Sequence, residues 1–170
     1  MADYVALLVT MGAVYVQPAL MEDKLAPAPK KAKKVMFTDP FIFHAVNAWV
    51  HPCEDPFEDQ IKTLLSDADW SAKLTETSMA THYARYYPTY YIKAKGEVDI
   101  AYVDKGRFWP IEVKWTGQLR PKQIKQIAKY SHGLILTKSR QAGNIQGTET
   151  MPLPLALLRL GSTTGNQPST

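Results

Sequence analysis

The sequence predicts an α/β domain in which a mixed central sheet is flanked by helices. Two observations carry this prediction. The first is the order of segments along the chain, which is three helices, three strands, a helix and a strand. The second is the apolar run GLILT at residues 133–137, which is typical of a buried strand and implies helices on both faces of the sheet. A chain of 170 residues, 45% of them apolar, is expected to form one such domain with at most an appendage.

The composition argues against several classes of protein. The one cysteine, Cys53, cannot form an internal disulfide, so the chain needs no oxidising compartment and we expect it in the cytoplasm. Residues 1–16 are apolar but contain Asp3 and lack Lys and Arg, which disfavours both a secretory signal and a membrane span. The pattern G-x-x-x-x-G-K-[ST] is absent from the sequence, so the chain carries no phosphate-binding loop of that kind.

Charge is distributed unevenly along the chain. Residues 54–69 contain six acidic residues and one lysine, whereas residues 105–140 contain nine Lys or Arg and a single acid, Glu112. The basic stretch is either an ordinary solvated surface or a surface that meets phosphates. The net charge of +4 favours an anionic partner only weakly.

Residues 1–33 are expected to form an N-terminal extension. Residues 3–11 fit a short helix, and residues 13–17 and 34–37 fit two strands. The segment between these strands, PALMEDKLAPAPKKAK, is rich in Pro, Ala and Lys and predicts a mobile loop. A helix followed by such a hairpin resembles the last part of a winged-helix domain, so the extension is either a winged-helix remnant or a plain appendage.

Three helices are expected before the sheet. Asp39 and Pro40 form a good helix start, and the following FIFHAVNAWV is apolar nearly all round, which predicts a buried helix of about three turns. Residues 55–66 fit an amphipathic helix with one apolar stripe. Residues 74–87 fit a third helix, which Pro88 closes.

The remaining elements surround a hairpin over residues 97–114. The content of Tyr, Ile and Thr predicts a strand at residues 89–94. A helix is expected over residues 120–133, with a proline near its start and a glycine at its end. Residues 151–160 fit either a strand or a helix, and residues 161–170 have the composition of a disordered tail.

The predicted hairpin carries charged residues inside runs that otherwise fit buried strands. With its turn at residues 105–106, cross-strand partners have numbers that sum to 211, so Asp99 faces Glu112. In the same register Glu97 faces Lys114. Paired carboxylates have Cβ atoms about 5 Å apart and repel each other unless a cation lies between them; Mg²⁺ or Mn²⁺ suits such oxygen ligands. The alternative is a half-exposed hairpin whose polar face meets solvent, with an ordinary ion pair between Glu97 and Lys114.

The segments GEVD (residues 96–99) and IEVK (residues 111–114) resemble the PD-(D/E)XK nuclease motif. They are similar to the variant in the C-terminal domain of many prokaryotic, archaeal AAA-type ATPases, and the resemblance covers about residues 34–138. It implies a restriction-endonuclease-like core over residues 34–160 and a metal-dependent nuclease that hydrolyses phosphodiester bonds in DNA. The chain departs from the family pattern at Val98, which replaces the proline of the motif. The ATPase modules that usually precede the domain are absent from these 170 residues, so the chain is either a separated fragment or a stand-alone remnant.

The resemblance also assigns roles at the metal site. Asp99 and Glu112 would bind Mg²⁺, or Mn²⁺, together with the carbonyl group of Val113. Lys114 would position the attacking water. Glu76, on the helix that precedes the sheet, matches a glutamate that orients a metal-bound water or completes the metal shell, although an exposed helix acid is the plainer interpretation.

The helix after the hairpin supplies candidate contacts to nucleic acid. Gln126 and Tyr130 match the Q-x-x-x-Y pattern of RecB-type recombination nucleases, although a surface pair without that role fits equally well. The basic side chains of this helix would contact flanking phosphates, and they are Arg120, Lys122, Lys125 and Lys129. Phosphate contacts do not read bases, so we expect little sequence specificity toward DNA, or toward RNA if that is the substrate.

Two other functions stay open. The fold fits a nucleic-acid-binding or partner-docking domain with weak or no catalysis, associated with an AAA-type ATPase. It also fits an oligomerisation domain, in which the apolar N-terminal segment pairs with a second copy. A homodimer is compatible with each of these functions, and no membrane partner is expected.

Overall fold

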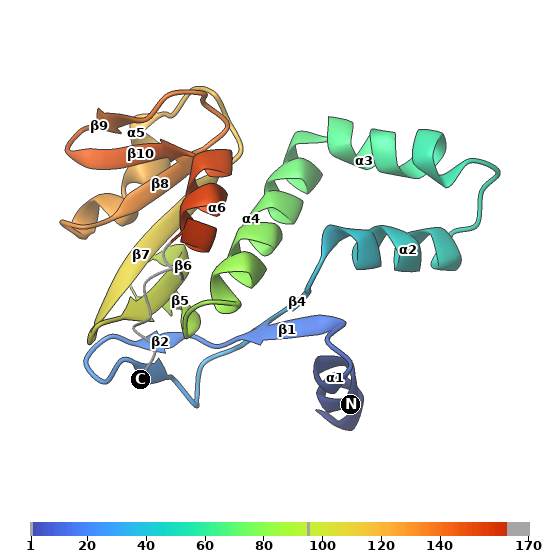
Figure 1. Ribbon diagram of the computed structural model, residues 1–170, viewed down its shortest axis with the longest axis horizontal. Helices are drawn as coiled ribbons and strands as arrows, with labels where there is room; N and C mark the ends of the chain where they lie inside the picture. The colour runs from blue at the N-terminus through green and yellow to red at the C-terminus, as the bar shows by residue number, and fades with distance from the viewer. Residues whose placement is uncertain (1, 95, 163–170) are drawn as a thin grey trace.

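The computed structural model describes residues 2–94 and 96–162 of the chain. It is an α/β domain built on a six-stranded mixed sheet with the strand order β5-β6-β7-β8-β10-β9 (Figure 1). The six strands are β5 (Thr89–Lys93), β6 (Glu97–Asp104), β7 (Arg107–Lys114), β8 (Leu134–Thr137), β9 (Gly143–Ile145) and β10 (Thr148–Pro152).

The directions of the strands confirm the predicted mixed sheet. β5, β6 and β7 are antiparallel, whereas β7, β8 and β10 run parallel and β9 returns antiparallel to β10. The GLILT segment forms β8, and its residues Ile135 and Leu136 have no exposed surface. A strand between two parallel neighbours is covered on both faces, which explains its apolar sequence. The sequence did not predict β9.

The β6–β7 hairpin has the predicted turn and, over most of its length, the predicted register. Lys105 and Gly106 have φ angles of 49° and 74°, as a two-residue primed turn requires. The paired residues run from Asp104–Arg107 at the turn to the Ile100–Ile111 pair. The regular β6–β7 ladder ends at this pair. The predicted pairs Asp99–Glu112 and Glu97–Lys114 are therefore not ladder pairs.

A β-bulge in the neighbouring β5–β6 pair lies at the point where the β6–β7 ladder ends. Between Tyr90 and Ile92 the pairing of β5 with β6 shifts, because Asp99 and Ile100 of β6 together stand opposite the single residue Tyr91. A bulge bends its strand and changes the direction in which side chains point. The strict alternation on which the predicted cross-strand pairs depended therefore fails at the candidate site.

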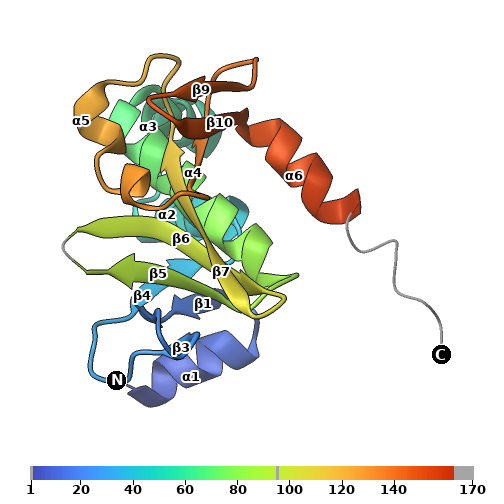
Figure 2. The same cartoon turned by 90° about the vertical axis from the view of Figure 1, so that its left-hand side faces the viewer.

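Helices cover both faces of the sheet, as predicted. On one face α4 (Ala68–Ala84) and α6 (Leu153–Ser162) enclose a core with Ile100, Val113 and Leu136. On the other face lie α5 (Pro121–Ile124) and the short η2 (Ile127–Lys129), whose isoleucines pack on Ala101 and Ile135. Figure 2 shows α5 and α6 on opposite sides of the strands.

Several of the predicted helical segments differ in extent. α4 begins six residues earlier than expected, because the side chain of Asp67 caps it by accepting from the N–H groups of Asp69 and Trp70. The expected helix over residues 120–133 is divided into α5 and η2. The segment at residues 151–160 is both strand and helix, because β10 leads directly into α6. α6 reaches into the predicted tail, and residues 163–170 lie outside the described residues.

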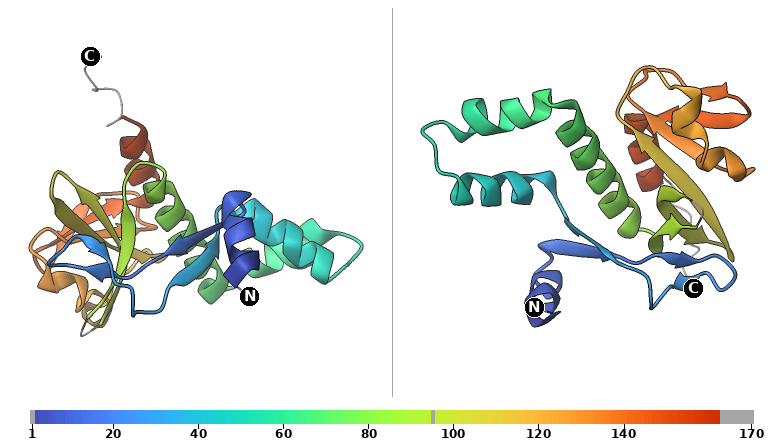
Figure 3. Two further views of the ribbon diagram at one scale, coloured as in Figure 1. Left: turned by 90° about the horizontal axis from the view of Figure 1, so that it is seen from below. Right: turned by 180° about the vertical axis from the view of Figure 1, so that it is seen from behind.

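α2 (Pro40–Val50) begins at the predicted Asp39 cap, but the prediction that it is buried is wrong. No residue of α2 is buried, and the side chains of Phe41 and Trp49 are 77% and 82% exposed. α2 and the following η1 (Phe57–Ile61) and α3 (Lys62–Ser66) project away from the sheet (Figures 1 and 3). A helix that is apolar on all sides is buried only where other elements surround it. Here α4 and β4 contact only part of α2.

The N-terminal residues form α1 (Ala2–Thr10) and the antiparallel pair β1 (Val14–Gln17) and β4 (Lys34–Phe37), as predicted. The segment between these strands is not the expected mobile loop. It contains the small hairpin of β2 (Leu20–Met21) and β3 (Ala26–Pro27), and the side chains of Ala19 and Leu20 are buried. Ala19 forms a bridge to Tyr91 of β5, which holds this segment against the edge of the sheet.

Candidate functional site

Two carboxylates are buried where β6 and β7 part. Asp99 and Glu112 are 8% and 6% exposed. The N–H group of Val113 donates to Asp99 Oδ2 at 2.9 Å, so the side chain of Asp99 takes the place of a backbone acceptor beside the bulge. β7 lies between β6 and β8 with helices over both faces, so Glu112 is removed from water by its position in the sheet.

A single lysine lies between the two acids. Lys114 Nζ is 2.6 Å from Glu112 Oε1 and 4.0 Å from Asp99 Oδ2. The other oxygen of Glu112, Oε2, is buried and has no hydrogen-bond partner among the described residues. The structure thus brings the predicted Asp99, Glu112 and Lys114 together, with two negative groups for one positive group.

Burial and mutual repulsion raise the pKa of both acids. Burial, followed by the charge of Glu112, raises the pKa of Asp99 to about 7. Burial also raises the pKa of Glu112, although Lys114 offsets part of the effect. Burial lowers the pKa of Lys114, but the charges of Asp99 and Glu112 outweigh it and the pKa is raised. The site therefore favours an additional positive charge, either a proton or a cation.

We expect the free energy of unfolding to fall as the pH rises. The pKa of Asp99 is raised from 3.8 to about 7 in the folded protein, so between these values the folded state binds a proton that the unfolded state lacks. The Asp99 contribution is thus present at low pH and lost by about pH 7. Urea unfolding with EDTA should give about 1–3 kcal/mol less stability at pH 8 than at pH 5.

The Asp99→Asn variant is the control for this pH dependence. The pKa of His44 is lowered by burial, which acts in the opposite sense because protonation of His44 favours the unfolded state. The difference between wild type and variant removes the His44 effect. An equally steep dependence in both proteins would contradict the raised pKa of Asp99.

Glu76 and Glu97 lie in a second group of charges beside the first. Lys34 Nζ of β4 is 2.8 Å from Glu76 Oε1 and 2.8 Å from Glu97 Oε1. Lys93 Nζ is 2.7 Å from Glu97 Oε2. The prediction that Glu97 pairs with Lys114 is therefore wrong: burial raises the pKa of Glu97, but Lys34 and Lys93 outweigh it and the pKa is lowered. The charge of Glu76 raises the pKa of Asp99, which places Glu76 within electrostatic reach of the site.

Gln17 supports the site from the N-terminal hairpin. Its side chain is fully buried, and Nε2 donates to the carbonyl groups of Tyr90 and Asp99 at 2.9 and 3.2 Å. It therefore joins β5 to β6 at the bulge. Gln17 and Lys34 were not predicted from the sequence, because each contacts residues far away in the chain. The sequence feature that could have indicated Gln17 is a glutamine at the end of the apolar strand segment AVYV.

Replacing Gln17 by leucine is expected to lower the free energy of unfolding by about 1–3 kcal/mol, because the two buried carbonyl groups lose their donor. The measurement is urea unfolding at constant pH. Gln141→Leu makes the same chemical change at an exposed position and should alter stability by less than about 0.5 kcal/mol. Equal stability of the two variants would show that Gln17 does not hold the bulge.

The candidate nucleic-acid contacts lie along α5 and η2. The four basic side chains predicted to contact phosphates are exposed, and they are Arg120, Lys122, Lys125 and Lys129. Gln126 and Tyr130 are not on one continuous helix, but both line a cavity of about 270 Å³ together with Lys129. Gln126 lies against Gly96, where a Cβ atom would be 2.0 Å from Gln126 Cδ. The glycine of the GEVD segment thus makes room for this side chain.

The acidic pair fits a hard divalent cation. Within the described residues, no group of three or more His, Cys, Asp or Glu side chains is arranged to hold a metal ion, and Glu76 is paired with Lys34. Mg²⁺ keeps several waters and is commonly held by one or two carboxylates. The pair of Asp99 and Glu112, with the unpartnered Glu112 Oε2, meets that requirement.

No family model, curated protein or solved structure matches this chain. Within residues 2–94 and 96–162, no helix combines the length and apolar character needed to cross a membrane.

Proposed function

We propose that this chain is a metal-dependent nuclease of the PD-(D/E)XK type, with a restriction-endonuclease-like core over residues 34–160. It would hydrolyse phosphodiester bonds in DNA with little sequence specificity. One observation carries the proposal: two buried carboxylates of raised pKa share one lysine, and one carboxylate oxygen has no hydrogen-bond partner within residues 2–94 and 96–162. Two buried carboxylates with one positive partner destabilise a fold unless a further cation binds. A functional role is therefore the simplest explanation for the arrangement.

Each residue of the site has a separate proposed role. Asp99 and Glu112, with the carbonyl group of Val113, would hold Mg²⁺ or Mn²⁺, which when bound supplies an activated water and neutralises the scissile phosphate. Lys114 would orient the attacking water by donating a hydrogen bond, since its ammonium already lies between the acids. Glu76 would accept a hydrogen bond from that water or complete the binding shell.

The exposed basic residues of α5 and η2 support binding to a phosphate backbone. Arg120, Lys122 and Lys125 would neutralise phosphates outside the cleavage site, and this contact carries no base information. Gln126 and Tyr130 would contact the same strand from their shared cavity.

Exposed apolar side chains favour a second candidate, a partner-docking domain. Phe41 and Trp49 of α2 are largely exposed, and so are Tyr4 of α1 and Met11 directly after it, which are 75% and 69% exposed. Surfaces of this kind commonly mark interaction sites. A second copy of the chain and an AAA-type ATPase module are the partners that this function would take.

Metal binding and cleavage test the two candidates together. Calorimetric titration with Mg²⁺ and Mn²⁺ should detect binding, and EDTA should abolish cleavage of plasmid DNA, of single-stranded DNA or of RNA. Ca²⁺ also binds oxygen ligands, so it should compete for the site. If the wild type binds no divalent ion even with DNA present, the nuclease proposal is wrong and the docking function remains.

A further inference from the structure

A cavity of about 500 Å³ opens at the carboxyl ends of the parallel strands. Lys114 of β7 pairs with Thr137 of β8, and Thr137 pairs with Pro152 of β10. The residues that follow two of these strand ends, Trp115 and Lys138, line the cavity. Ligands of open α/β sheets commonly bind outside the carboxyl ends of parallel strands.

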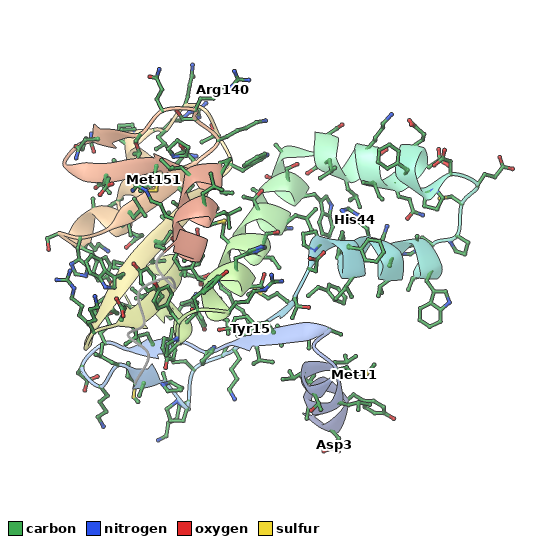
Figure 4. All side chains as sticks on the ribbon, viewed as in Figure 1. Asp3, Met11, Tyr15, His44, Arg140 and Met151 are labelled. Atoms are coloured by element: carbon green, nitrogen blue, oxygen red, sulfur yellow. The ribbon has the colours of Figure 1, made fainter. Side chains whose placement is uncertain are left out.

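The lining combines one aromatic ring with positive charge. Lys138 Nζ lies 5.1 Å from the centre of the Trp115 ring, and Arg140 comes from the same loop as Lys138. Lys138 and Arg140 are exposed, and Figure 4 shows Arg140 at the upper edge of the molecule. None of the described residues that line the cavity is acidic. Pro152 and Leu155 complete it with apolar surface.

This cavity is adjacent in the sequence to the site of the buried carboxylates. Trp115 follows Lys114, whose ammonium lies between Asp99 and Glu112. The N–H group of Thr116 donates to the Lys114 carbonyl at 2.7 Å, so the backbone turns tightly around Trp115. Lys138 N–H in turn donates to the Thr116 carbonyl at 3.3 Å, which fixes the Trp115 and Lys138 loops to each other.

We propose that this cavity binds a single-stranded polynucleotide, with a base stacked on Trp115 and the adjoining phosphates on Lys138 and Arg140. A flat apolar ring next to two flexible cations matches the alternating base and phosphate of an unpaired strand, whereas a paired base keeps its faces inside the duplex. The exposed ammonium of Lys138 moves from the indole face to a phosphate when a base stacks there. This inference deepens the proposed nuclease function: the strand that enters or leaves the carboxylates is unpaired.

The test is fluorescence and anisotropy titration with oligothymidylate and oligouridylate about eight nucleotides long, in EDTA so that no cleavage occurs. A duplex of equal length is the comparison ligand. We expect tryptophan quenching by the single strands, and binding weakened at least about tenfold in Trp115→Leu and in Lys138→Gln/Arg140→Gln. Lys24→Gln/Lys105→Gln, which removes two charges elsewhere, should bind within about twofold of wild type. The two oligonucleotides distinguish a DNA strand from an RNA strand.

Wild-type affinity in the Lys138→Gln/Arg140→Gln variant, which changes only exposed side chains, would overturn the inference, as would equal or tighter binding of the duplex. Asp104→Asn, at the turn of the β6–β7 hairpin, should retain the oligonucleotide binding, since its change lies outside both the cavity and the carboxylate pair. Failure of the inference is separable from failure of the nuclease proposal. If the cavity variants cleave as the wild type does, the inference is wrong and the nuclease proposal stands. If strands bind at Trp115 but are not cleaved, the inference is supported and the nuclease proposal is wrong.

Discussion

Replacing Asp99 by asparagine should reduce DNA cleavage at least about a hundredfold and leave the protein as stable as wild type or more stable. Asparagine keeps an oxygen that can accept from the N–H group of Val113, the bond that Asp99 Oδ2 now makes at 2.9 Å. It removes the charge that burial and Glu112 disfavour, so the free energy of unfolding at pH 8 should rise by about 1–3 kcal/mol. Loss of activity with gain of stability is the signature of a functional charge.

Three measurements check this prediction: cleavage rate, divalent-ion affinity by calorimetry, and urea unfolding in EDTA. Asp104→Asn makes the same change at the turn end of the same strand, opposite Arg107, and should leave cleavage within about twofold of wild type. If Asp99→Asn were strongly destabilised, the carboxylate would have a structural role. If it cleaved DNA normally, Asp99 would not belong to a nuclease site.

Replacing Lys114 by methionine should have the second largest effect, because it leaves Glu112 buried without its positive partner. Lys114 Nζ is 2.6 Å from Glu112 Oε1, and the other oxygen of Glu112 has no hydrogen-bond partner in the part of the chain that the structure describes. Breaking such a pair from one side commonly costs several kcal/mol, and we expect a loss of about 2–4 kcal/mol at pH 8. At pH 5 the loss should be smaller, because Glu112, whose pKa is already raised, then takes up a proton.

The double variant Glu112→Gln/Lys114→Met tests whether the stability lost in Lys114→Met comes from the unpaired charge of Glu112. Removing both charges should recover part of the stability lost in Lys114→Met, because the buried charge of Glu112 and its repulsion of Asp99 are then gone, while Asp99 still accepts from the N–H group of Val113. Lys105→Met, at the exposed turn of the same hairpin, controls for the loss of a surface lysine. A Lys114→Met variant that is as stable as the Lys105 control at pH 8 would contradict the buried ion pair. Cleavage should be lost in both variants that lack Lys114.

The features that the sequence determined by itself are those that depend on neighbours in the chain. Asp39 caps α2 because its side-chain oxygen lies close enough to the backbone to accept from the N–H group of Phe41, two residues later. Residues 105–106 turn the hairpin because glycine tolerates a positive φ. The turn then sets the register as far as the Ile100–Ile111 pair, which places Asp99, Glu112 and Lys114 close together. These elements follow from local geometry, so a pattern of residues is enough to predict them.

Only the tertiary structure decided what surrounds those residues. The bulge at Asp99 arises opposite Tyr91, and Gln17 and Lys34 reach the site from a hairpin more than forty residues away from Glu76 or Asp99 in the chain. α2 has the composition of a buried helix yet is exposed, because composition does not specify which elements lie beside a helix. Contacts between distant segments depend on how all elements pack together. For that reason the acidic pair was visible in the sequence, and its supports and the neighbouring Trp115 cavity were not.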